Sequence, residues 1–202
     1  MAALMAHTTD TIETLAARIA SEKPIRGRRE PRETVDVAVT SVSPNGRYVE
    51  VRLAPPTSLR LSHTRPGQYI VATFADGEPR FLVLANAPGQ AWSLLVEPNP
   101  ELAKPLAELA SGDSLTVSAA EGSGYPEVSA DERLVIFATG SGVASVQGVL
   151  EHISRMERAP ETHLFYGEND SNDFAYLREL KSVEAAGIAH VGLAADGEFV
   201  QD

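Results

Sequence analysis

The chain has 202 residues, of which 43% are hydrophobic and 22% charged, with a formal net charge of −11. This composition is typical of a globular protein with one large or two small domains, and the acidic balance argues against a nucleic-acid partner. The absence of cysteine excludes disulfides, thiolate metal ligands and an iron–sulfur cluster held by this chain. No apolar run reaches the roughly 18 residues of a membrane span, so we expect a soluble, cytoplasmic protein.

Residues 1–33 are predicted to form an N-terminal helix and a linker. Within 9–21 the residues Ile12, Leu15, Ala16 and Ile19 have helical spacing, which indicates an amphipathic helix. It docks either on its own domain or on a partner subunit, and the sequence favours neither strongly. Residues 23–33 combine two prolines with five basic residues, so they indicate a linker that would also attract an acidic partner.

Residues 34–130 show short β-rich runs separated by turn signals such as Pro-Asn-Gly and Asp-Gly. Six strands at this spacing predict a small antiparallel barrel. A helical pattern at 101–110, with Leu102, Leu106 and Leu109 in register, is expected to plug one end of the barrel or to connect across it. The six predicted strands span 34–42, 47–53, 68–74, 80–84, 92–96 and 114–118.

Residues 131–202 alternate strands with helices, which predicts βαβ units and a parallel sheet. Between the first strand and the first helix lies Gly140-Ser141-Gly142, a turn at which backbone N–H groups of a helix N-terminus can approach a phosphate. Asp173 is expected to cap the second helix. The predicted strands are 133–138, 162–166 and 189–193, and the helices are 144–155 and 174–186.

Four local signatures, in chain order, resemble the ferredoxin–NADP reductase superfamily from about residue 34 onward. They are Arg65-Pro66-Gly67-Gln68-Tyr69, Ser111-Gly112-Asp113-Ser114-Leu115, Phe137-Ala138-Thr139-Gly140-Ser141-Gly142-Val143 and Leu164-Phe165-Tyr166-Gly167. The resemblance implies a β-barrel plus α/β fold, in which a six-stranded flavin-type barrel precedes a partial NAD(P)-binding domain. It also implies FAD or FMN in the barrel and NAD(P) at the glycine turn, with Thr139, Gly140, Ser141, Gly142 and Val143 as contacts.

The flavin strand departs from the family's Arg-x-Tyr-Ser/Thr pattern. The resemblance puts Arg80 at the phosphate-binding arginine, but Leu82 replaces the stacking tyrosine and Val83 replaces the hydroxyl that would bond flavin N5. Phe81 supplies a stacking ring only if a bulge shifts the strand register. In the equivalent of the family's diphosphate turn, Pro100 lacks an N–H and Glu101 adds negative charge.

The α/β half also differs from the family. Three strands are predicted where the family has five, and its Cys-Gly element is absent, so the resemblance implies a truncated domain. Its open parallel edge should then be covered by a partner chain or another segment. The aliphatic flavin strand is similar to a plastid branch of the superfamily, which implies the plastid stroma if the source is a photosynthetic eukaryote.

Two functions follow from these observations. One is a ferredoxin-reductase-like oxidoreductase module that transfers electrons between flavin and nicotinamide despite a degraded flavin site. The other is a non-catalytic structural, assembly or regulatory subunit, with the N-terminal helix and the open sheet edge as partner surfaces. Acidic residues at 168–173 favour NAD over NADP. The five histidines lack metal-ligand spacing, so no metal site is expected.

Overall fold

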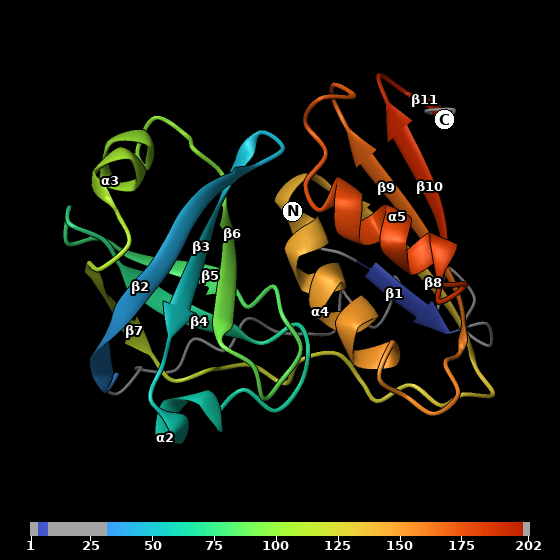
Figure 1. The fold of residues 1–202 in the computed structure, drawn as a ribbon, viewed down its shortest axis with the longest axis horizontal. Coiled ribbons are helices and arrows are strands. Elements are labelled where there is room, and N and C mark those ends of the chain that lie inside the picture. The colour runs from blue at the N-terminus through green and yellow to red at the C-terminus, as the bar shows by residue number, and fades with distance from the viewer. Residues whose placement is uncertain (1–3, 8–31, 200–202) are drawn as a thin grey trace, which may run out of the picture.

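The computed structural model describes residues 4–7 and 32–199. A β-barrel and an α/β unit lie side by side, with helix α4 (Val143–Ile153) between them (Figure 1). The predicted N-terminal helix at 9–21 and most of the predicted linker lie outside the described residues.

The barrel is a six-stranded antiparallel sheet in the order β5-β4-β7-β2-β3-β6. A bridge between Leu84 and Leu94 joins the two outer strands, and Ala85 N donates to Ser93 O at 2.8 Å. These contacts close the sheet, which confirms the predicted barrel. The strands are β2 (Thr34–Asn45), β3 (Tyr48–Ala54), β4 (Tyr69–Thr73), β5 (Pro79–Val83), β6 (Trp92–Val96) and β7 (Ser114–Ser118).

Alternating apolar side chains fill the barrel because successive residues of a strand point to opposite faces. Val37, Val39 and Leu53 are among the residues that contribute to this core. Helix α3 (Ala103–Glu108) is shorter than the pattern at 101–110 suggested, but Leu102 and Leu106 pack into the barrel as expected. A short helix, α2 (Thr57–Arg60), was not predicted.

The α/β unit contains the three predicted parallel strands, β8 (Arg133–Thr139), β9 (Glu161–Glu168) and β10 (His190–Ala195). Two further strands correct the prediction. β1 (Leu4–His7) pairs antiparallel with β8, and β11 (Glu198–Phe199) pairs antiparallel with β10. In the structure, the edge of the parallel sheet at β8 is flanked over four residues by β1, and the edge at β10 is flanked over two residues by β11.

Helices α4 (Val143–Ile153) and α5 (Leu177–Ala185) lie on the same face of this sheet, toward the barrel (Figure 1). On the other face the rings of Phe137 and Phe165 stack with centroids 5.2 Å apart and are partly exposed. None of the helices in the described part of the chain is long and apolar enough to cross a membrane.

The two units share a continuous apolar contact. The apolar core formed by α4, α5 and the parallel sheet also includes three residues of the barrel, which are Tyr48, Ala85 and Leu95. A second contact corrects the expected cap of α5. This helix begins at Leu177, and Asn45 of the barrel accepts a hydrogen bond from Tyr176 N at 2.7 Å, whereas Asp173 makes no cap to it.

Candidate functional site

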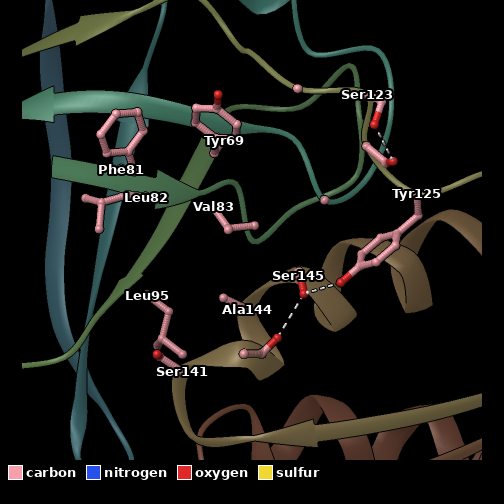
Figure 2. Close-up of a pocket in the computed structure, with 14 residues that line it drawn as sticks. Tyr69, Phe81, Leu82, Val83, Leu95, Ser123, Tyr125, Ser141, Ala144 and Ser145 are labelled. Atoms are coloured by element: carbon pink, nitrogen blue, oxygen red, sulfur yellow. Dashed lines mark hydrogen bonds between the residues drawn. The ribbon is translucent and has the colours of Figure 1, made fainter. Parts of the chain in front are cut away.

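A cavity of about 470 Å³ lies between the barrel and the α/β unit. We call it the aromatic cavity, because Tyr69 and Phe81 form one wall and Tyr125 closes one end (Figure 2). The opposite wall is the glycine turn and the start of α4, with Ser141, Gly142, Ala144 and Ser145. This volume is in the usual range for a small-molecule site.

The barrel wall is held by regular strand pairing. β4 and β5 pair without a bulge, with Val71 opposite Phe81 and Tyr69 opposite Val83. The rings of Tyr69 and Phe81 are therefore diagonal neighbours, with centroids 5.7 Å apart and planes tilted by 60°. Phe81 reaches the cavity without the register shift that the sequence analysis required, while Leu82 and Val83 also line it.

A charged group borders the aromatic pair. The Arg32 guanidinium lies 5.2 Å from the centroid of Phe81, and its Nε lies 2.5 Å from a carboxylate oxygen of Glu121. The Tyr69 hydroxyl donates to the other oxygen of Glu121 at 3.4 Å. The carboxylate thus fixes both the cation and the phenol at the rim of the cavity.

The glycine turn has the predicted strand, turn and helix order. Gly140 has a φ of +58°, a conformation that glycine adopts without a Cβ penalty. The residues Gly140–Gly142 form a single 3₁₀ turn that leads directly into α4. Helix α4 therefore directs its N-terminal backbone N–H groups and its positive dipole end toward this part of the cavity.

Ser145 fixes the glycine turn to the segment between β7 and β8. Its hydroxyl donates to Gly142 O at 2.9 Å, as Figure 2 shows. Because that proton is used, the Tyr125 hydroxyl is the donor in its 2.8 Å contact with Ser145 Oγ. Burial raises the pKa of Tyr125, so the phenol keeps the proton that it donates.

The structure brings together only part of the predicted set. Phe81, Ser141 and Gly142 line the aromatic cavity. Arg80, Thr139, Gly140 and Val143 are not among its lining residues, and Val143 is buried in the core below the turn. The sequence analysis did not identify the pair formed by Tyr125 and Ser145. The glycines at 122 and 124, both with positive φ, were the signal that the segment between β7 and β8 turns back toward the glycine turn.

Arg80 is engaged by its own turn. Its two terminal nitrogens contact the two oxygens of Asp76 at 2.9 and 2.6 Å, and Nη1 also donates to Glu78 O at 3.0 Å. Asp76, and at longer range Glu101, raise the pKa of Arg80, and Arg80 lowers that of Asp76. The positive charge of Arg80 is thus matched by a bidentate carboxylate.

The backbone donors before α3 are also occupied. Asn99 Oδ1 accepts hydrogen bonds from the N–H groups of Glu101 and Leu102, both at 3.0 Å. Pro100 has no N–H to offer. The segment that would receive a diphosphate in the family is therefore satisfied by a side chain of the protein itself.

A buried carboxylate joins the two units behind the glycine turn. Glu168 Oε1 accepts hydrogen bonds from Tyr48 at 2.7 Å and Tyr166 at 2.5 Å, and its side chain is 2% exposed. A Cβ on Gly140 would lie 3.5 Å from the Tyr48 hydroxyl, so the glycine turn packs against the group formed by Tyr48, Tyr166 and Glu168. Burial, followed by the bond to Glu168, raises the pKa of both tyrosines.

No group of three or more potential ligands in the described residues is arranged to hold a metal ion. Among the histidines of the described ranges, His63 is buried near the barrel, and the rings of His163 and His190 stack on the sheet with centroids 4.9 Å apart.

Comparison with known proteins agrees with this architecture. Residues 136–191 match the family model for the "Oxidoreductase NAD-binding domain". A curated relative, the "Phenol hydroxylase P5 protein" of Acinetobacter pittii (strain PHEA-2), is 29% identical over 145 residues. That match covers 65% of this chain and 41% of the relative, so the chain spans less than half of the relative's length.

The solved structures with the same architecture include the following two. The ferredoxin–NADP⁺ reductase of Plasmodium falciparum has a TM-score of 0.65 at 13% identity, covering 80% of this chain and 70% of its own. The flavohem-like FAD/NAD-binding domain of nitric oxide dioxygenase from Vibrio cholerae has a TM-score of 0.65 at 19% identity, with coverages of 84% and 78%. A barrel joined to a parallel sheet with a glycine turn defines a reductase-type fold. Residues 136–191 thus match an oxidoreductase NAD-binding domain, and the chain shares the overall fold of these reductases.

Proposed function

We propose that the protein is a ferredoxin-reductase-like electron-transfer module whose aromatic cavity receives the ring system of a flavin. The carrying observation is the position of this cavity between the Tyr69–Phe81 pair on the barrel and the glycine turn at the start of α4. A planar ring gains stacking and apolar contact on the first wall, and backbone donors lie at the second. Bound there, flavin would pass electrons between a nicotinamide and an acceptor.

The residues fit the ring of a flavin but not the diphosphate of FAD. Arg80 is neutralised by Asp76, and Asn99 already accepts the N–H groups before α3. Glu101 would repel a phosphate at the same place. The proposal is therefore that the ring supplies the affinity, so that FAD binds no more tightly than riboflavin.

For the nicotinamide cofactor we propose NAD rather than NADP. Asp170 follows β9 and accepts hydrogen bonds from the backbone and side-chain amides of Asn172, so an acidic turn lies at the carboxyl end of this strand. Such a turn is unfavourable for the additional phosphate of NADP. Glu168 takes no part, because two buried tyrosines hold it.

The first test is the visible absorption spectrum of the purified protein, followed by titration with FAD, FMN and riboflavin. The proposal predicts saturable binding with similar dissociation constants for FAD and riboflavin. Asp76→Asn should release Arg80 and tighten FAD and FMN several-fold while riboflavin is unchanged. Glu157→Gln, which removes one exposed carboxylate from the α/β unit, is the control for net charge.

A second candidate is a non-catalytic subunit, and the Asp76–Arg80 pair with the Asn99 contacts favours it. It predicts a colourless protein that binds none of the three flavins, and no tighter FAD binding in Asp76→Asn. That result would contradict the electron-transfer proposal for this chain. Binding of FAD at least a hundredfold tighter than riboflavin would contradict both the second candidate and the proposed ring-based affinity.

A further inference from the structure

A second cavity, of about 270 Å³, lies further along the contact between the barrel and the α/β unit. We call it the polar cavity. β3 and β6 of the barrel contribute Glu50, Arg52 and Ser93, and α4 contributes Gln147, less than one turn beyond Ser145 of the aromatic cavity. It has no part in the function proposed above.

Three side chains that line the polar cavity each have one buried polar atom without a hydrogen-bond partner. These atoms are Gln147 Oε1, the Tyr176 hydroxyl and Trp92 Nε1, and the three residues are 6%, 3% and 0% exposed. Buried polar groups in proteins are nearly always paired, because an unpaired one loses its bonds to water without replacement. Unpaired groups around a cavity therefore indicate a polar ligand.

The protein groups at this cavity are mainly acceptors. Glu50, Glu151 and Glu179 give it three carboxylates, against the single cation of Arg52. Arg52 is already paired with Glu50 at 3.2 Å, and Glu50 also accepts from Ser93 at 2.7 Å. Glu151 accepts hydrogen bonds from Ala87 N at 3.0 Å and Gln90 Nε2 at 3.1 Å, and it is paired with Arg155 at 3.8 Å. The remaining oxygens call for a ligand that donates hydrogen bonds and carries positive charge.

We infer that the polar cavity binds a small organic cation through a primary ammonium group, with Gln147 Oε1, the Tyr176 hydroxyl and the carboxylates of Glu50 and Glu179 as the groups that recognise it. An ammonium has three donors and no acceptor, which matches an amide oxygen, a phenol oxygen and a carboxylate. A metal ion is a poorer match, because no cluster of metal ligands is present in the described residues.

Tyr176 also has an unusual backbone. Its φ of +57° is left-handed, and it stands at the first position before α5, held by the hydrogen bond from its N–H to Asn45. A non-glycine residue in this conformation stores backbone strain. The hairpin turn of the barrel thus sets the position of the phenol between the two units.

Binding can be measured without any added label. Trp92 is the single tryptophan of the chain, and it lines the polar cavity. Titration of the full protein with putrescine should change the tryptophan fluorescence saturably, and 1,4-butanediol, the neutral molecule of similar length, should not. Sodium chloride at matched ionic strength controls for simple screening of the acidic surface.

Two variants test the assigned contacts. Glu179→Gln changes an exposed side chain and should weaken putrescine at least fivefold, whereas Glu157→Gln, the same charge change at an exposed position, should not. Tyr176→Phe should weaken it similarly. Equal responses to the diol and the diamine, a linear response without saturation, or unchanged affinity in Glu179→Gln would overturn the inference. Riboflavin binding is measured in parallel, so that loss of the aromatic cavity is distinguished from loss of this one.

Discussion

At the scale of single residues, the contact between the two units depends on a glycine in the turn between β2 and β3. Gly46 has a φ of +60°, and a Cβ there would collide with the carbonyl oxygens of Asp173 and Phe174, the latter at 2.5 Å. Gly46→Ala is expected to cost roughly 3–4 kcal/mol, from left-handed strain together with displacement of the facing backbone. Urea denaturation of the variant measures this loss.

Gly77 offers a matched comparison. Its φ of +79° is also left-handed, but a Cβ would meet nothing within 4 Å. Gly77→Ala should therefore cost only the conformational penalty, about 1–2 kcal/mol. Equal losses in the two variants would show that the close approach of Gly46 to Asp173 does not contribute to stability.

His63 predicts an acid-sensitive contribution to stability. Burial lowers the pKa of His63 from 6.5 to about 4. Between these two pH values the unfolded chain binds the proton and the folded chain does not, so stability falls as pH decreases through 6.5 and levels off below 4. We expect a loss of about 2 kcal/mol, less than the full difference because water and neighbouring dipoles relax around the charged ring.

The variant His63→Leu separates the contribution of His63 to the pH dependence of stability from that of the carboxylates. The free energy of unfolding is measured from pH 7 to 4 for both proteins, and their difference reports His63 alone. The variant should gain relative stability as the pH falls. Parallel curves would mean that the ring is protonated equally in the folded and unfolded chains.

At the scale of elements, the sequence predicted the regular parts of the fold well. The strands at 92–96 and 114–118 coincide with β6 and β7, because their apolar runs are bounded by unambiguous turn residues. Elements of two to four residues, β1, α2 and β11, were not predicted. Such short segments have no measurable periodicity, and their pairing depends on a partner strand far away in the chain.

The packing of α4 on the barrel depends on Gly148. A Cβ there would lie 2.9 Å from the backbone oxygen of Asn86. Gly148→Ala improves helix propensity by up to about 1 kcal/mol. The added methyl group also displaces α4 from the barrel, and this cost should be larger, so we expect the free energy of unfolding to fall by roughly 1–2 kcal/mol. Thermal unfolding tests this, with Ser182→Ala in α5, an exposed site, as the control that should change stability little. A stabilised Gly148→Ala protein would contradict the close contact.

At the scale of the whole molecule, the sequence predicted the architecture and the glycine turn, but not which residues meet. Phe81 reaches the aromatic cavity through ordinary strand pairing, whereas Arg80, one residue earlier, is held by Asp76. Both residues can be read from the sequence. Whether Arg80 binds a phosphate or pairs with Asp76 depends on the geometry of the turn between β4 and β5, which the sequence does not specify. Likewise Tyr48 and Glu168 are 120 positions apart and become neighbours only when the two units join.

The buried Glu168 carboxylate should therefore connect the stability of the two units. Glu168→Ala removes the acceptor of two buried phenols, each of which then costs about 1–3 kcal/mol, so we expect a total loss of roughly 2–5 kcal/mol. Glu168→Gln keeps one acceptor oxygen and should lose less. Tyr166→Phe combined with Glu168→Ala should cost less than the sum of the single changes, because the phenol left unpaired by the alanine is gone. Urea denaturation of the unchanged protein, Tyr166→Phe, Glu168→Ala and the double variant measures the coupling free energy between the two side chains. Strict additivity would mean that the contribution of the Tyr166 hydroxyl to stability does not depend on Glu168.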